Sequence, residues 1–349
     1  MEKTAITELF AAANGFGGFR SYFDDIFNRK DYSRVFILKG GPGTGKSTVM
    51  KKVLDKFRDK CFVQSIRCSS DPNSLDGVTI TSGEIRVAII DGTSPHEEDA
   101  YFPGAVDEII NLGEAWNESI LVKHRGEIVS LCELKKKHYR SAYDLLDIAG
   151  SIFDKESNLT SSIYVGNDES LIANEIPKIA NKKSGRHKHV ALLSSFSARG
   201  LTRLEANASE TVSVSGRYGS EYIFLDHFAK AISLSGHEHT VLHSPFSESL
   251  VEGIYLHATD TLYLANAGNG RVINTCRFLD DTALQYNEAL YSLYGRCRAE
   301  ILDASKHEFQ NASDAHFKLE RIYSKSIDFD TVNRITESLI NEINYLFCN

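Results

Sequence analysis

The sequence predicts an α/β protein in which one structural plan occurs twice. Short apolar segments of strand length alternate with longer segments of helical periodicity along the chain. Features of the first half recur in the second half at an offset of 176 residues. The length of 349 residues suits two units of about 150 to 200 residues each. We therefore expect two tandem units, residues 1–183 and 184–349, with the polar stretch NKKSGRHKH (181–189) as the linker.

In the first half, an apolar strand at 35–38 enters a Gly-rich loop, and a helix is expected from about Lys46. Further strands are expected at 62–66, 78–80 and 85–90. The last two are joined by the four residues TSGE, a linker too short for a parallel crossover, so they should form a hairpin or a bent strand. Long helical segments are then expected at 106–154 and 168–180.

The second half repeats these features. At the offset of 176, glycines and one acidic position coincide: Gly40 with Gly216, Gly43 with Gly219, Asp76 with Glu252 and Gly77 with Gly253. The segment GVTI-TSGE-IRVAII becomes GIYL-HATD-TLYLAN, and with a small shift Gly18 matches Gly200. Helical segments at 282–324 and 330–347 close this half. A constant offset over several elements indicates a tandem duplication.

The loop after the first strand, GGPGTGKS, fits the phosphate-binding pattern GxxxxGK[ST] between a strand and a helix. Its glycines let backbone N–H groups converge on phosphate oxygens, and the helix N-terminus adds partial positive charge. Lys46 would bridge the β- and γ-phosphates, and the Ser47 hydroxyl would bind Mg²⁺. The expected nucleotide-binding residues are Gly40, Gly41, Pro42, Gly43, Thr44, Gly45, Lys46, Ser47 and Thr48.

The carboxylate that a Mg²⁺–nucleotide site requires is expected at Asp91, where the buried strand IRVAII ends. Many ATPases place Glu directly after this Asp to activate water, but here the next residue is Gly92. The base must come from elsewhere, or turnover is slow, or the acceptor is not water. His96 is the favoured candidate for the catalytic base or a γ-phosphate sensor, with a surface histidine as the alternative.

The polar loop CSSDPNSLDG follows the second strand, where doubly wound sheets place ligand-contacting loops. Ser69, Ser70 and Asp71 would there contact substrate or metal. Capping of the loop by short polar side chains explains the same residues without a ligand. Both interpretations remain open at this point.

The motifs GGPGTGKST, CSSDPNSLDG, VAIIDGTSPH and PGAVDEIINLGEAW occur in this order, and with them the first half resembles a bacterial family of tandem P-loop proteins described as ATP-binding or ATPase-like. The resemblance is strong over residues 1 to about 120 and fainter beyond. It implies two P-loop NTPase-like, three-layer domains with mainly parallel sheets, each followed by a long helical segment. It also implies nucleotide binding at Gly40 to Thr48 with Asp91, and it brings no established substrate.

The second loop, SGRYGSEYI, departs from this pattern. At the offset of 176, Lys46 becomes Tyr222, Ser47 becomes Ile223, and Asp91 becomes Ala267, or Asn266 after a slip of one residue. The cation, the hydroxyl and the metal carboxylate are all missing, so this copy is expected to bind no nucleotide. Its remaining roles are packing against the first copy or supplying an arginine to the intact site, with Arg199 and Arg217 as the candidates.

Composition narrows the class of protein. The net charge is −8, with 42% hydrophobic and 25% charged residues, so there is no strong nucleic-acid signal. No apolar run approaches the roughly 18 residues of a membrane span, and the first residues do not resemble a signal peptide. A cytoplasmic protein is expected. The six cysteines show no metal-binding spacing and are interpreted as free thiols.

Three functions fit the intact motif. The first is an Mg²⁺-dependent ATPase that moves its helical segments against each other or against an unknown protein partner. The second is a small-molecule or nucleotide kinase, although no lid with clustered arginines stands out. The third is a nucleotide-gated assembly or switch protein with little turnover, in which a homo-oligomer is also possible. ATP is favoured over GTP because no guanine-reading motif stands out.

Overall fold

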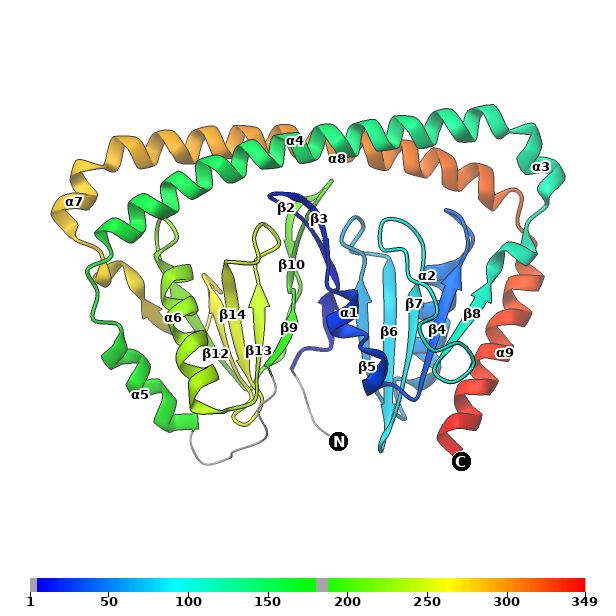
Figure 1. Ribbon diagram of the computed structural model, residues 1–349, viewed down its shortest axis with the longest axis horizontal. Coiled ribbons are helices and arrows are strands. Elements are labelled where there is room, and N and C mark those ends of the chain that lie inside the picture. The colour runs from blue at the N-terminus through cyan, green and yellow to red at the C-terminus, as the bar shows by residue number, and fades with distance from the viewer. Residues whose placement is uncertain (1–4, 180–187, 349) are drawn as a thin grey trace.

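The computed structural model describes residues 5–179 and 188–348 (Figure 1). The predicted boundary between residues 183 and 184 and most of the predicted linker lie outside these residues. Within them the chain is an α/β protein with two six-stranded sheets. Each sheet is followed by a long helix, as the sequence predicts.

The first sheet has the strand order β1-β5-β6-β7-β4-β8. The bounds of these strands are β1 Glu8–Phe10, β4 Arg34–Lys39, β5 Phe62–Arg67, β6 Leu75–Ser82, β7 Ile85–Asp91 and β8 Asp107–Asn111. β4 lies parallel to both β7 and β8, and β1 lies parallel to β5. β6 runs antiparallel to both of its neighbours, so the sheet is mixed. The expected hairpin is confirmed in β6 and β7, whereas the predicted helix from residue 106 is wrong where β8 forms.

The second sheet repeats this order position by position, as β9-β13-β14-β15-β12-β16. Its strands are β9 Lys188–Ala191, β12 Glu210–Ser215, β13 His239–His243, β14 Val251–Leu256, β15 Thr261–Ala265 and β16 Arg271–Asn274. β14 is again antiparallel on both sides. The expectation of mainly parallel sheets is therefore wrong for one internal strand in each half. The short linkers on either side of that strand impose its direction.

In each half, a matching hairpin follows the first strand of the sheet, β1 or β9. The strands β2 (Ala12–Gly15) and β3 (Gly18–Ser21) form the first, and β10 (Ser194–Ser197) and β11 (Gly200–Arg203) form the second. Gly18 and Gly200 occupy the same place in the two turns, as the sequence comparison predicts, and both have positive φ, +97° and +77°. The repeated strand order and the repeated hairpins support a tandem duplication.

Helices follow the same repeated scheme. The short helices are α1 Phe23–Ile26, α3 Glu118–Lys123 and α7 Asp281–Tyr286, with 3₁₀ turns η1 Arg29–Asp31, η2 Leu112–Ala115 and η3 Thr275–Phe278. The longer ones are α2 Lys46–Phe57, α4 Arg125–Ile163, α5 Glu169–Ile179, α6 Ser220–Ser235, α8 Glu288–Ser324 and α9 Phe329–Cys348. α2 and α6 follow equivalent strands, as do α4 and α8. Asn111 and Asn274 cap η2 and η3 in the same way, each accepting a hydrogen bond from a backbone N–H two residues on.

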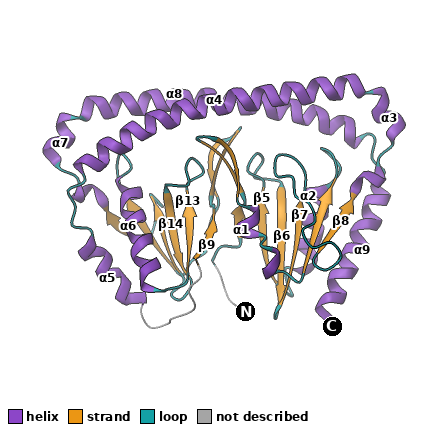
Figure 2. Ribbon diagram, in the orientation of Figure 1, coloured by secondary structure: helices purple, strands orange, loops and turns teal. Residues whose placement is uncertain are grey.

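The long helices α4 and α8 lie side by side in opposite directions and cross above both sheets (Figures 1 and 2). Contacts along them include His138 Nδ1 to Glu308 Oε2 at 2.8 Å, and a hydrogen bond of 2.9 Å from Ser305 Oγ to the Ala142 carbonyl oxygen. We call this antiparallel pair the arm. Because α4 leads away from the first sheet and α8 leads back to it, the helices that follow them are exchanged between the halves.

This exchange places α5 against α6 of the second half and α9 against α2 of the first half. Val332, Leu339 and Ile343 of α9 share an apolar cluster with Val49 and Met50 of α2. The exchange is not predicted by the sequence repeat, because a repeat defines which segments are equivalent but not which copy each segment packs against. The C-terminal helix therefore belongs, in space, to the first sheet.

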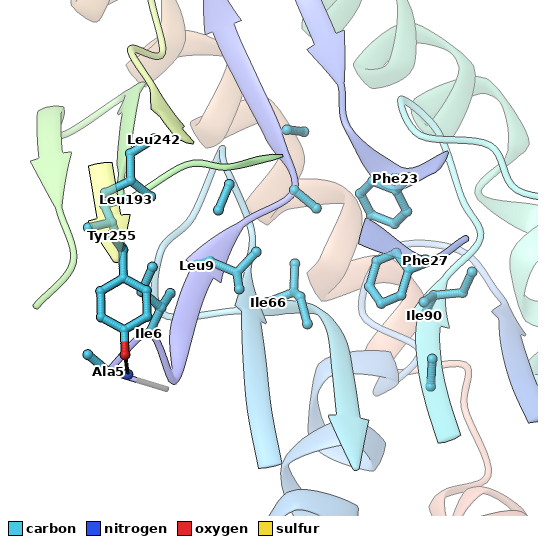
Figure 3. Packing of buried hydrophobic residues seen from close by; sticks show 14 of the residues in the cluster. Ala5, Ile6, Leu9, Phe23, Phe27, Ile66, Ile90, Leu193, Leu242 and Tyr255 are labelled. Atoms are coloured by element: carbon cyan, nitrogen blue, oxygen red, sulfur yellow. Dashed lines mark hydrogen bonds between the residues drawn. The ribbon is translucent and has the colours of Figure 1, made fainter. Parts of the chain in front are cut away.

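The other face of each sheet packs into a shared apolar cluster rather than under long helices (Figure 3). Ile66 and Ile90 contribute to it from the first sheet and Leu242 from the second, with Phe23 of α1 covering the first. The backbone N–H of Ala5 donates a hydrogen bond of 3.1 Å to Tyr255 Oη across the halves. In the described residues, each sheet is covered by long helices on one face only, which differs from the expected three layers.

Candidate functional site

The Gly-rich loop connects β4 to α2, and its backbone has the conformation that its glycines permit. Gly43 and Gly45 have positive φ, +68° and +87°, a region that residues with a Cβ rarely adopt. The Thr44 hydroxyl donates a hydrogen bond of 2.8 Å back to the Gly41 carbonyl oxygen and closes the loop. α2 begins at Lys46, and its first N–H groups have no partner within the helix. The loop therefore presents backbone donors and a helix N-terminus at one place.

Lys46 and Asp91 meet at the carboxyl ends of two neighbouring strands. β4 and β7 are parallel, with Leu38 directly opposite Asp91 in the ladder, so the loop after one strand faces the end of the other. Lys46 Nζ donates hydrogen bonds to the carbonyl oxygens of Gly40 at 2.7 Å and Gly41 at 3.1 Å. It also lies 3.7 Å from Asp91 Oδ2. Burial raises the pKa of Asp91, and the Lys46 ammonium opposes this rise.

Two hydroxyl groups, those of Ser47 and Thr93, lie beside Lys46 and Asp91. Ser47 Oγ accepts a hydrogen bond of 3.1 Å from the Leu75 N–H at the start of β6. Asp91 Oδ1 accepts hydrogen bonds from Thr93, from the N–H at 2.9 Å and from the hydroxyl at 2.6 Å. No group of three or more His, Cys, Asp or Glu side chains within residues 5–179 and 188–348 is arranged to hold a metal ion by itself. A hydroxyl and one carboxylate suit Mg²⁺, which keeps most of its ligands as water or phosphate oxygens.

His96 is brought to the site but is fully engaged there. Its side chain is buried against the Phe23 ring, with the two ring centroids 4.5 Å apart. Nε2 lies 3.3 Å from Asp76 Oδ2, and Nδ1 lies 3.1 Å from the Asp91 carbonyl oxygen. Burial alone would lower the pKa of His96, but the Asp76 and Asp91 carboxylates raise it to about 9.

A protonated ring with both nitrogens engaged has no lone pair with which to accept a proton from water. The expected role of His96 as catalytic base therefore does not fit this geometry. The ring instead connects the end of β7 to Asp76, which lies in β6.

The segment 92–106, which carries His96, is anchored by a buried ion-pair cluster. Arg29 lies 2.9 Å from both Glu98 Oε2 and Asp107 Oδ1. Asp107 Oδ2 accepts hydrogen bonds from the N–H groups of Tyr101 and Phe102. Because each charge has an opposite charge beside it, burial is tolerated, and breaking one partner would leave the others unpaired.

Side chains from the β10–β11 hairpin of the second half reach the polar loop 68–77. Ser195 Oγ donates a hydrogen bond of 2.7 Å to the Ser69 carbonyl oxygen. Arg199, at the tip of the second hairpin, pairs with Asp71 at 3.3 Å with both side chains about half exposed. Arg199 therefore holds the two halves together at this loop, and its observed ion pair is not with the residues expected to bind phosphate.

The arm rests directly on the Gly-rich loop. A Cβ at Gly41 would lie 3.0 Å from the Tyr323 ring, and one at Gly43 would lie 2.8 Å from the Glu320 carbonyl oxygen. On the other arm helix, Tyr139 Oη donates a hydrogen bond of 3.1 Å to Ser70 Oγ. The loops at this end of the first sheet are thus in contact with both helices of the arm.

The second loop has a different alignment from the one that the sequence offset predicts. Gly216 matches Gly40, but α6 begins after Gly219, which has φ +88° and matches Gly45 with φ +87°. The segment from Gly216 to Gly219 is therefore two residues shorter than that from Gly40 to Gly45. From this point the offset is 174 rather than 176, so the predicted equivalents Tyr222 and Ile223 are wrong.

With this correction, Ser220 stands in place of Lys46 and Glu221 in place of Ser47. In the ladders, Val214 lies opposite Ala265 as Leu38 lies opposite Asp91. Ala265 therefore replaces the carboxylate, where the sequence comparison predicted Ala267 or Asn266. The expected loss of the cation, the hydroxyl and the carboxylate still describes this loop.

Glu221 is buried within its own loop. Its Oε1 accepts a hydrogen bond of 3.0 Å from Asn266 Nδ2, and its Oε2 has no hydrogen-bond partner among the described residues. Beside it, Ser220 Oγ and Thr275 Oγ1 are 2.8 Å apart. Burial raises the pKa of Glu221. A carboxyl group thus lies between the carboxyl ends of β12 and β15, in the place where Lys46 and Asp91 meet in the first half.

Arg217 is exposed and stays on its own loop. Its guanidinium donates a hydrogen bond of 3.1 Å to Tyr218 Oη and lies 5.1 Å from the centre of that ring. Tyr218 in turn stacks on Tyr291 of α8, with ring centroids 4.1 Å apart. The contacts of Arg217 are therefore not with the first site, in contrast to its suggested role there.

The sequence did not single out Asp76, Thr93 or the arm residues near the first loop as site residues. Asp76 was visible only as a repeated acidic position, matched by Glu252. The arm residues had no sequence signal, because they come close to the loop only through the exchange of helices between the halves.

Comparison with known protein families, with curated protein sequences and with solved structures gave no match. Within residues 5–179 and 188–348, no helix combines the length and the apolar composition needed to cross a membrane.

Proposed function

We propose that this protein binds ATP with Mg²⁺ at the loop from Gly40 to Thr48 and hydrolyses it, and that the first half is a P-loop NTPase domain. The observation that carries the proposal is the meeting of Lys46 and Asp91 at 3.7 Å beside a loop with two left-handed glycines and a helix N-terminus. Such a place favours a polyphosphate with its metal. The second half is proposed to be an inactive copy of the same domain.

Each residue has a distinct role in this proposal. The backbone N–H groups of the loop bind phosphate oxygens, and Lys46 leaves the carbonyl oxygens of Gly40 and Gly41 to contact the β- and γ-phosphates. Ser47 and Asp91 hold the metal ion and its water. The metal neutralises charge that develops on the phosphates.

We propose slow hydrolysis. His96 has no free ring nitrogen, and Gly92 follows Asp91 where many ATPases place Glu. A kinase activity is the alternative that the same loop permits, and a binding protein with little turnover is the second. The products formed from Mg-ATP distinguish these three activities. Hydrolysis releases phosphate without an acceptor, a kinase forms ADP only when an acceptor is present, and a binding protein forms neither product.

The experiment measures binding of Mg-ATP by calorimetry and release of phosphate and ADP, with and without a metabolite extract. We expect Lys46→Ala to lower the affinity about 100-fold, because charge-assisted contacts to phosphate contribute about 1.5 to 3 kcal/mol each. The matched control is Lys52→Ala, an exposed residue of the same helix that pairs with Asn333. Binding that survives Lys46→Ala, or that is absent from the unaltered protein, would refute the proposal.

A further inference from the structure

One face of α4 is turned toward the polar loop that follows β5, which lies at the same end of the first sheet as the Gly-rich loop. Cys132, Lys135 and Tyr139 follow one another at intervals of three and four residues and so lie along one side of the helix. Tyr139 marks where this side points, since its hydroxyl contacts Ser70 and its ring packs edge-on against Phe309 of α8. Lys135 lies one turn before Tyr139 on the same side.

The helix paired with this face holds the arm in a fixed place over the loop. Tyr323 and Glu320 of α8 contact the backbone at Gly41 and Gly43, and the Trp116 ring packs against Tyr323 with centroids 6.1 Å apart. Beyond α8, Val332 of α9 comes within 3.7 Å of a Cβ position at Gly45. α8 and α9 thus contact the Gly-rich loop, and α4, which carries Lys135, is packed along α8.

The ammonium group of Lys135 is partly buried there without a partner. Among the described residues it has no hydrogen bond and no ion pair, while its neighbours Lys136 and Lys137 on the helix are exposed. Burial lowers the pKa of Lys135, Cys132 on the same side of the helix opposes this, and repulsion from Lys46 and Lys136 lowers the pKa further. Glu320 is the acidic group of α8 in this region, and it is paired with His316 at 3.5 Å.

Lys46 has Asp91 beside it at 3.7 Å, whereas Lys135 is a partly buried cation with no carboxylate partner among the described residues. Holding like charges together away from water is costly unless an anion lies between them. Lys46 already belongs to a loop built for phosphate, so the same anion can satisfy both lysines.

We propose that Lys135 is a further phosphate-binding residue, which reaches from the arm to the terminal phosphate of the nucleotide held by the Gly-rich loop. This inference rests on the proposed function of that loop. The contact between α4 and the ligand would then distinguish ATP from ADP. Loss of the γ-phosphate removes this contact, whereas Lys46 still contacts the β-phosphate. The affinity of the site for ATP relative to ADP then depends on Lys135.

The test compares dissociation constants for ADP and for a non-hydrolysable ATP analogue, both with Mg²⁺. In Lys135→Ala we expect binding of the analogue to weaken about 10-fold and binding of ADP to change less than 2-fold. A 10-fold change is what the loss of one partly buried charge-assisted contact would cause. Lys135→Arg should restore most of the preference. Lys136→Ala, an exposed lysine of the same turn, is the control and should leave both constants unchanged.

A measurement on the unaltered protein covers the case in which the variants do not fold. Acylation of lysines by an activated ester, followed by mass spectrometry, should show Lys135 protected by the ATP analogue and much less by ADP, with Lys136 equally reactive throughout. An unaltered protein that binds neither nucleotide would refute the proposed function itself. Nucleotide binding with an unchanged ATP to ADP preference in Lys135→Ala, or with equal protection by both nucleotides, would refute the role of Lys135 alone.

Discussion

The two loops at the ends of β4 and β12 share a similar backbone conformation but carry side chains of opposite charge. Both leave a strand, turn at a glycine with φ near +88° and start a helix. In the first, a lysine and an aspartate flank a loop of free backbone donors. In the second, the loop is shorter and the carboxyl group of Glu221 lies where phosphate would bind, held by Asn266.

This difference shows that the polar groups of the second loop are satisfied largely within the loop and the arm. In the second loop, Ser220 and Thr275 satisfy one another, and Tyr218 packs on Tyr291 of the arm. In the first, Lys46 is held only by backbone carbonyl oxygens and a long contact to Asp91. Binding of a ligand requires polar groups that are free to contact it, and we therefore expect binding at the first loop rather than the second.

The largest effect is expected from giving the first loop the residue of the second. In Ser47→Glu, a carboxylate would enter the loop and repel phosphate, and the hydroxyl proposed to bind Mg²⁺ would be lost. We expect the affinity for Mg-ATP to fall about 1000-fold or more, which corresponds to about 4 kcal/mol. Calorimetry measures it, with thermal unfolding as the check that the variant is folded.

The reverse exchange, Glu221→Ser, should create no nucleotide site, since the loop remains two residues short and Ala265 still stands at the position of Asp91. One bound nucleotide per chain is expected in the unaltered protein and in this variant. Two bound nucleotides per chain in either would contradict the comparison between the loops.

Much of the fold was accessible from the sequence, for reasons that the two halves make clear. Strand positions such as 35–38 and 85–90 were predicted because buried strands are continuous apolar runs, and the hairpin of β6 and β7 because its linker is short. β8 was missed because DEIIN is brief and continues into a helical pattern. The expectation of mainly parallel sheets did not take account of β6 and β14, each of which pairs with its two neighbours in the sequence through short linkers that require antiparallel pairing.

The site residues that lie in one local motif could be predicted from the sequence. The residues that only the exchange of helices brings to the site could not. The loop from Gly40 to Thr48 and Asp91 followed from local motifs. Tyr323 is near that loop only because the arm crosses both sheets and returns, whereas Lys135 lies on α4 as this helix leaves the first sheet. The alignment of Lys46 with Ser220 was missed because two residues are absent inside the second loop, and a constant offset cannot show a deletion.

The next largest effect is expected on the free energy of unfolding, through His96. The second half has no equivalent residue, because only residues 266–270 join β15 to β16. The pKa of His96 is raised from 6.5 to about 9 in the folded protein, chiefly by Asp76. The ion pair therefore stabilises the fold fully below pH 6.5, progressively less between pH 6.5 and 9, and not above. Relative to His96→Gln, the unaltered protein should lose about 3 kcal/mol of unfolding free energy over that interval.

Urea unfolding at pH 6, 7.5 and 9 measures this difference, and Asp76→Asn should remove it in the same way. Nuclear magnetic resonance titration of His96 in the folded protein gives the pKa directly. A pKa near 6.5 there would mean that the link between Asp76 and the end of β7 is not an ion pair, in contrast to the equivalent Glu252 of the second half, which pairs with Arg203 at 2.6 Å.

The smallest effect is expected at Glu221. Because burial raises its pKa, ionisation of this carboxyl group costs stability as the pH rises above its unfolded-state pKa, and Glu221→Gln removes that cost. The amide oxygen can still accept from Asn266, and the amide N–H can satisfy oxygens of Ser220 or Thr275. We expect a gain of about 1 kcal/mol in unfolding free energy at pH 7 and a smaller gain at pH 4. A loss of stability in Glu221→Gln would show that the second loop requires the charge of Glu221, and that it resembles the first loop more closely than its hydrogen bonds indicate.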